Sequence, residues 1–171
     1  MYEPIKNTYT YDTISHDIEY IHTDSFDHLP KNSVRQCIAV AFHNDKIILV
    51  NNVNKPGVYV LIGGSVEEGE DLRATIIREI QEESNMNVIH SKPIGYQKVS
   101  RTDGEEESYY QIRYFCIVEP HGPFVTDPDG DVTEVLEIDP DEHKRYFDWG
   151  VTSDAIMERA MEFKREYDLG K

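Results

Sequence analysis

Gly64–Met86 reads GSVEEGEDLRATIIREIQEESNM, and this stretch decides how the rest of the 171-residue chain is interpreted. It contains Glu70, Arg78, Glu79, Glu82 and Glu83 within one short segment. On a helix, at about 100° per residue, Glu79, Glu82 and Glu83 fall within one sector of roughly 100°. Carboxylates on one helix face repel one another unless a cation lies among them. The stretch therefore predicts a helix that carries a metal site.

The chemistry of such a site can be argued from the ligands. Carboxylate oxygens suit Mg²⁺ or Mn²⁺ better than Zn²⁺. The preceding pair Gly63-Gly64 lets the backbone approach a metal and a phosphate closely. A divalent ion there would neutralise phosphate charge and activate water, and a carboxylate would accept the proton of that water. Glu82, Glu83 or an acid of a later loop are all open as that proton acceptor.

The spacing of this stretch resembles the Nudix box, the signature of the Nudix hydrolases. The pattern is Gly, five residues, Glu, seven residues, then Arg-Glu-aliphatic-any-Glu-Glu-any-any-aliphatic. The matching positions are Gly64, Glu70, Arg78, Glu79, Ile80, Glu82, Glu83 and Met86. The one departure is Asn85, where the family usually has Gly. Because Asn tolerates the left-handed backbone best after Gly, we expect Asn85 to end the helix and leave the chemistry unchanged.

The resemblance implies a fold and a set of roles. The fold would be α+β, the Nudix α/β/α sandwich with a mixed β-sheet. The metal shell would comprise Glu79, Glu82, Glu83 and the backbone carbonyl of Gly63. Arg78 would orient these groups and pair with Glu70 at the helix start.

The activity implied by the resemblance is Mg²⁺- or Mn²⁺-dependent cleavage of the pyrophosphate bond in a nucleoside diphosphate linked to another group. A nucleoside triphosphate is the substrate that remains, mostly by elimination, because the sequence motifs typical of other Nudix subfamilies are absent. The alternative is a non-catalytic module on the same fold that binds a nucleotide or metabolite. Such modules usually lose box carboxylates, whereas this chain keeps all of them.

The composition limits the classes of binding partner and the cellular location that we expect for this protein. Acidic residues outnumber basic ones by 33 to 17, which gives a net charge of −16 and argues against nucleic acid or an anionic membrane as a partner. No apolar run approaches the ~18 residues of a membrane span, and the N-terminus lacks a signal-peptide pattern. Cys37 and Cys116 lie in apolar runs, as buried free thiols in a reducing compartment would. We therefore expect a cytoplasmic protein.

The chain divides into two parts. Residues 1–33 are polar, acidic and rich in tyrosine, and we expect an N-terminal extension that adds an edge strand or a dimer arm, so that a homodimer is possible. Residues 34–171 would form the Nudix hydrolase domain. Within this domain, hydrophobic alternation and turn residues predict the following elements: strands at Val34–His43, Lys46–Asn51, Val58–Ile62, Ile94–Ser100, Ser108–Glu119 and Thr133–Ile138, the box helix at Glu70–Ser84, and a final helix from Thr152 or Ser153 to about Tyr167.

Substrate-binding candidates are Gly64, Arg101 and Arg113. Arg113 falls in a strand with no cleanly polar face, which predicts a central strand buried on both sides. A buried guanidinium needs an anionic partner, and a buried Glu and the substrate phosphate are equally open. Trp149 could stack on a base or simply pack against the last helix.

A second acidic cluster spans residues 127–134, DPDGDVTE. Its spacing does not fit a calcium-binding EF-hand loop. It is either a turn or a loop over the active site that supplies an extra metal ligand or a base. For that second role we rank Glu134, as a catalytic residue, ahead of Asp131.

Overall fold

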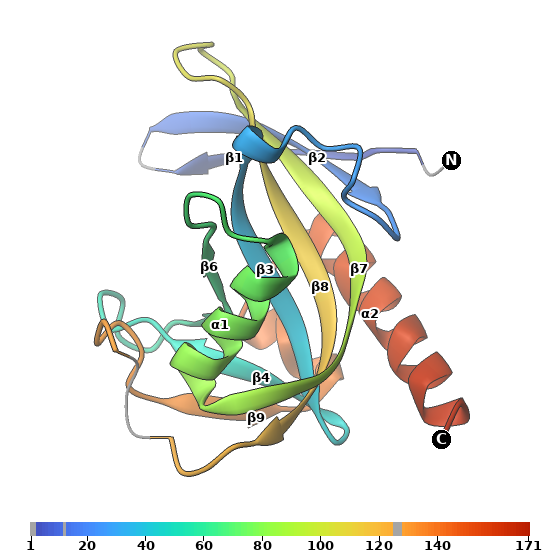
Figure 1. Cartoon of the computed structure of the whole chain (residues 1–171). Helices are drawn as coiled ribbons and strands as arrows, with labels where there is room; N and C mark the ends of the chain where they lie inside the picture. The colour runs from blue at the N-terminus through green and yellow to red at the C-terminus, as the bar shows by residue number, and fades with distance from the viewer. Residues whose placement is uncertain (1–2, 12, 125–127) are drawn as a thin grey trace.

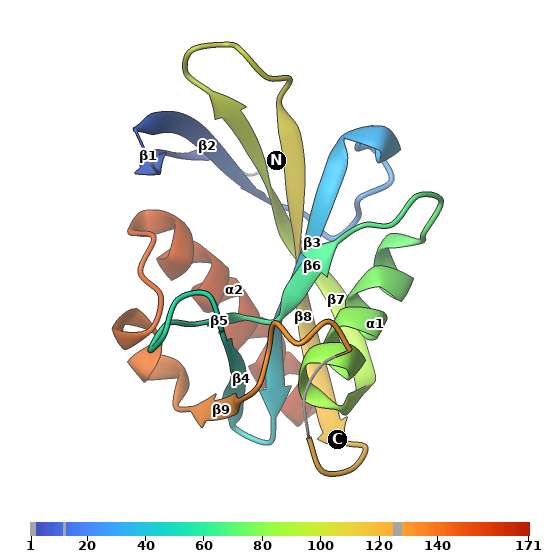
Figure 2. The same ribbon diagram turned by 90° about the vertical axis from the view of Figure 1, so that its left-hand side faces the viewer.

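The residues described by the computed structural model, 3–11, 13–124 and 128–171, include nine strands of one mixed sheet with a long helix on each face (Figures 1 and 2). The elements follow one another in this order: β1 Ile5–Tyr11, β2 Ile14–His22, the 3-10 turn Lys31–Ser33, β3 Val34–His43, β4 Lys46–Asn51, β5 Tyr59–Leu61, β6 Gly63–Ser65, α1 Leu72–Ser84, β7 Met86–Arg101, β8 Tyr109–Pro120, β9 Val135–Ile138, the 3-10 turn Pro140–Arg145, and α2 Val151–Leu169.

The sheet runs in the order β1-β2-β7-β8-β3-β4-β5, with β6 paired to β3 and β9 paired to β4. β3 and β8 are parallel, and the other pairs are antiparallel. Residues 3–33 place β1 and β2 at one edge of the sheet, where β2 pairs with β7. Ile38 of β3 lies between Arg113 of β8 and Gly63 of β6, so these three residues form one row across the sheet.

Each face of the sheet has its own hydrophobic core. Because side chains alternate along a strand, Cys37 and Ala39 of β3 pack beneath Ile80 of α1, whereas Val40 and Phe42 contact the α2 side. This arrangement confirms the α/β/α sandwich. Both cysteines are free and buried, as predicted. In the described part of the chain, neither helix has the length and apolar character needed to cross a bilayer.

β8 is the central strand that the sequence predicts. It lies between β7 and β3, and every residue from Ile112 to Val118 is buried. Asn85 ends α1 with φ 52° and ψ 42°, the left-handed conformation expected of it.

Several predicted boundaries differ from those in the structure. The box helix begins at Leu72 rather than Glu70, because the Asp71 side chain accepts hydrogen bonds from the first free backbone N–H groups. The last helix begins at Val151 after Gly150, so Thr152 and Ser153 do not cap it. β7 starts at Met86 instead of Ile94, since the chain re-enters the sheet directly after α1.

Candidate active site

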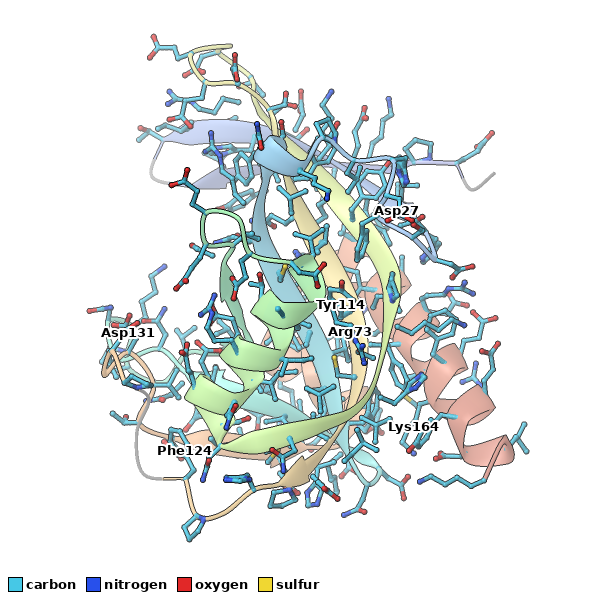
Figure 3. All side chains as sticks on the ribbon, in the orientation of Figure 1. Asp27, Arg73, Tyr114, Phe124, Asp131 and Lys164 are labelled. Atoms are coloured by element: carbon cyan, nitrogen blue, oxygen red, sulfur yellow. The ribbon has the colours of Figure 1, made fainter. Side chains whose placement is uncertain are left out.

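The three glutamates of α1 face one cavity of about 350 Å³. The helix presents them on one side, and Glu79 is only 9% exposed. The cavity is lined by Gly63, Gly64, Ser65, Glu67, Arg78, Glu79, Glu82, Glu83, Pro128, Asp129 and Asp131. Asp131, labelled in Figure 3, comes from the second acidic cluster. The structure therefore brings the box carboxylates, the glycine pair and a later acidic loop together.

The glycine pair lies directly against the carboxylates. The Gly63 N–H donates a hydrogen bond to Glu83 Oε2 at 3.0 Å. A Cβ added to Gly64 would lie well within 3.0 Å of the Glu79 carboxylate, closer than real Cβ atoms approach other atoms. Only glycine at position 64 allows this close packing of backbone and carboxylate.

Arg78 organises the acidic cluster. Its Nε and Nη2 donate to the two carboxylate oxygens of Glu70 at 2.9 and 3.0 Å, a bidentate pair. Its Nη1 donates to Glu79 Oε1 at 2.8 Å and to Glu82 Oε2 at 3.1 Å, and Nη2 also reaches the Ser65 carbonyl. One guanidinium thus holds three carboxylates in place.

The pKa values of Glu79 and Glu70 are shifted in opposite directions, by burial and by hydrogen bonding respectively. Burial raises the pKa of Glu79 above its usual value, although Arg78 opposes this. The hydrogen bonds from Arg78 lower the pKa of Glu70 from 4.5 to about 2. Glu70 therefore stays ionised in the fold and serves as the fixed partner of Arg78.

The lowered pKa of Glu70 predicts a dependence of stability on pH. Because the folded-state pKa lies below the unfolded-state value, the stabilisation is complete above about pH 4.5 and is lost as the pH falls toward 2. We expect Glu70→Gln to lower the free energy of unfolding by about 1–3 kcal/mol at pH 7 and by less at pH 3. Urea unfolding at both pH values measures this. Glu68→Gln, at an exposed position outside the cluster, is the control, and an effect of Glu70→Gln that is equal at both pH values would contradict the assignment.

The donor set around the cavity fits a hard divalent cation. Among the described residues of the lining, the charged groups that could act as ligands are all carboxylates, and none is a histidine or a cysteine. Among the described residues, no three potential ligands are already grouped around a metal position. Arg78 lies between Glu79 and Glu82 instead and balances part of their charge.

In the second acidic cluster, the structure places Asp131 rather than Glu134 at the carboxylate cavity. Glu134 accepts a hydrogen bond from the Tyr59 side chain, its backbone pairs with Asn51, and it does not line the cavity. Asp129 and Asp131 do line it. Asp127 lies outside the described residues. The sequence alone could not rank these acids, because their spacing does not reveal which way the loop folds.

The two arginines proposed to bind substrate have different surroundings. Arg101 pairs with Asp103 and Glu106 in the turn between β7 and β8, and it is not among the residues that line the carboxylate cavity. Arg113 is 2% exposed and donates to the side chains of Gln97 and Gln111 at 2.7 and 3.1 Å. Of the two partners considered for Arg113, a buried Glu is not the one found in the structure.

The comparison of sequences identifies the family. The family model of the NUDIX domain matches residues 33–158. NAD-capped RNA hydrolase NudC of Vibrio atlanticus (strain LGP32) is 38% identical over 72 residues, which cover 41% of this chain and 26% of that protein. NudC of Photorhabdus laumondii is 33% identical over 66 residues, covering 37% and 26%. The chain thus matches about a quarter of the length of these curated relatives.

Solved structures agree at the level of the fold. The Bacillus subtilis pyrophosphohydrolase BsRppH superposes with a TM-score of 0.60 at 19% identity, covering 81% of this chain and 77% of that one. A NUDIX hydrolase from Nitrosomonas europaea gives 0.59 at 18% identity, covering 77% and 90%. Since the family model covers most of the chain and includes the whole carboxylate cavity, the protein belongs to the Nudix family.

Proposed function

We propose that the protein is a pyrophosphohydrolase that cleaves the phosphoanhydride bond of a nucleoside diphosphate linked to another group, with Mg²⁺ or Mn²⁺ as cofactor. The observation that carries this proposal is the single cavity shared by Glu79, Glu82, Glu83 and the glycine pair. The retention of every box carboxylate favours turnover over a module that only binds.

Each residue of the cavity has a distinct part in this proposal. Glu79, Glu82, Glu83 and the carbonyl of Gly63 would hold the cation, which supplies positive charge at the phosphate oxygens. Arg78, fixed by Glu70, keeps two of the carboxylates oriented. Glu83, oriented by the hydrogen bond from the Gly63 N–H, would accept the proton of the attacking water.

Cation binding should stabilise the fold measurably. At 10 to 100 times Kd a ligand specific for the native state adds roughly 1–3 kcal/mol. For a chain of this size we expect the melting temperature to rise by about 2–10 °C in millimolar Mg²⁺ or Mn²⁺. Differential scanning fluorimetry against EDTA measures the rise, and Glu82→Gln should lose most of it. A wild-type melting curve that ignores both ions would count against the site.

A panel of substrates tests the activity itself. It should contain nucleoside triphosphates, dinucleoside polyphosphates, nucleotide sugars and NAD, each with Mg²⁺ or Mn²⁺, with release of phosphate, pyrophosphate or mononucleotide as the readout. An NAD-capped RNA oligomer belongs in the panel because the NudC relatives carry that activity in their names. The net charge of −16 weighs against strong binding to the body of an RNA.

The alternative function is binding without turnover. Binding of a nucleotide with no metal-dependent release from any compound of the panel would favour it and refute hydrolysis. A cytoplasmic location and a homodimer stay predictions from the sequence.

A further inference from the structure

A second cavity, of about 700 Å³, lies between the N-terminal hairpin and the start of α2. Asn7 and Tyr9 of β1 and His16 of β2 line one wall, and Trp149 lines another. The Asn7 side chain donates to the Trp149 carbonyl at 3.2 Å, which connects the hairpin to the loop before α2. The hairpin lies outside the segment that the family model matches, so this wall is a feature of this chain.

One strand of the sheet, β3, separates residues of the second cavity from residues of the carboxylate cavity. Arg113 lines the second cavity and Gly63 lines the first, while Ile38 lies between them in the row that crosses β8, β3 and β6. Neighbouring strands are about 4.8 Å apart, so the Cα atoms of Arg113 and Gly63 are roughly 10 Å apart. That separation is within the length of one nucleotide.

The base of the second cavity contains unpaired hydrogen-bonding groups. Arg113 is buried, yet among the residues that the structure describes its Nε has no partner and its Nη1 reaches only the Ile112 carbonyl at 3.4 Å. Burial lowers the pKa of Arg113 to about 10, so the group keeps its charge at neutral pH. Two further groups of the same lining, the Thr152 hydroxyl and His16 Nδ1, also have no partner in the described part of the chain. Buried polar groups are rarely left unpaired, so this set points to an absent ligand.

The walls of the second cavity are aromatic. The rings of Tyr9 and His16 are stacked, with centroids 5.8 Å apart. The Trp149 ring centroid lies 5.9 Å from the Arg113 guanidinium, and Tyr109 also lines the cavity. Aromatic surfaces suit a flat heterocycle, whereas a bare phosphate would leave them unused.

We propose that this cavity binds the base of the substrate, and that Arg113 selects a purine with an acceptor atom at O6, as in guanine. The proposal rests on the proposed function. The unpaired Nε–H of Arg113 can donate to O6 of guanine, whereas adenine presents an amino donor at that position. Tyr9 and His16 make the N-terminal hairpin part of the specificity site.

The only tryptophan of the chain, Trp149, reports on this cavity. Its fluorescence should be titrated in EDTA with GMP, AMP and inorganic phosphate. We expect GMP to change the fluorescence with a Kd about tenfold or more below that of AMP, and phosphate to change it little. Equal Kd values for GMP and AMP, a response to phosphate alone, or no response to any probe would each overturn the proposal.

Substitutions test the contributions of Tyr9 and Arg113 to binding separately. Tyr9→Ala, at a 46% exposed position that the fold tolerates, should weaken GMP binding about tenfold. Thr8→Ala, on the opposite face of β1, is the matched control and should bind as wild type. Arg113→Lys, checked by its melting curve, should bring the Kd values of GMP and AMP together. Unchanged GMP binding in Tyr9→Ala would remove the hairpin from the site.

These titrations do not depend on catalysis. Active hydrolysis without a preference for GMP would refute only the base specificity. Preference for GMP in a protein that hydrolyses nothing would refute only the proposed function.

Discussion

Glu83→Gln is expected to lower kcat by about 10²–10⁴-fold while the melting temperature in EDTA stays close to that of wild type. The amide cannot accept a proton from water at neutral pH, and it offers a cation no negative charge. The shape of the side chain is preserved, so its Oε can still accept the hydrogen bond from the Gly63 N–H. The fold therefore keeps the contact while the site loses the base.

The measurement is steady-state kinetics with the best substrate of the panel, together with a melting curve. Glu68→Gln makes the same chemical change at an exposed position that lines neither cavity, and it should leave kcat unchanged. Turnover by Glu83→Gln at the wild-type rate would show that another acid accepts the proton. Asp131, on the loop that lines the same cavity, would then be the next residue to test.

The parts of the fold that the sequence predicts are those set by local patterns. The amphipathic spacing of α1, the left-handed Asn85 that ends it and the apolar run of β8 each depend on residues near one another in the chain. The order and facing of the box carboxylates follow from helix geometry alone, and the structure places them on one cavity.

The parts that could not be predicted depend on contacts between distant segments. Asn7 and Trp149 are 142 positions apart, and nothing in either segment indicates that they meet. The alternation of β1 predicts a strand, but the partner of that strand and the cavity it walls off are properties of the assembled sheet. Asp131 rather than Glu134 lines the carboxylate cavity because of the path of a loop, which composition does not specify.

Gly64→Ala is expected to lower kcat/KM by about 10²-fold or more without unfolding the protein. The added methyl would overlap the Glu79 carboxylate, so that carboxylate has to move. Glu79 is buried and held by Arg78 at 2.8 Å, and its displacement disturbs the whole cluster. A displacement of about 1 Å at a catalytic site can lower the rate about 10²-fold. Kinetics with the best substrate and the rise in melting temperature with Mg²⁺ should both show the loss.

A glycine-to-alanine substitution away from the Glu79 carboxylate serves as the control for Gly64→Ala. Gly122→Ala places its methyl 3.4 Å from the nearest atom, the side-chain nitrogen of Asn85, and should leave turnover unchanged. Neither Gly64 nor Gly122 has a left-handed backbone, so alanine strains neither of them. Gly63→Ala is a poorer test, because its methyl would meet the backbone of Cys37 and Ile38 and disturb β3 itself. Wild-type turnover in Gly64→Ala would mean that the position of Glu79 is not needed for catalysis, and the proposed cation shell would then have to exclude it.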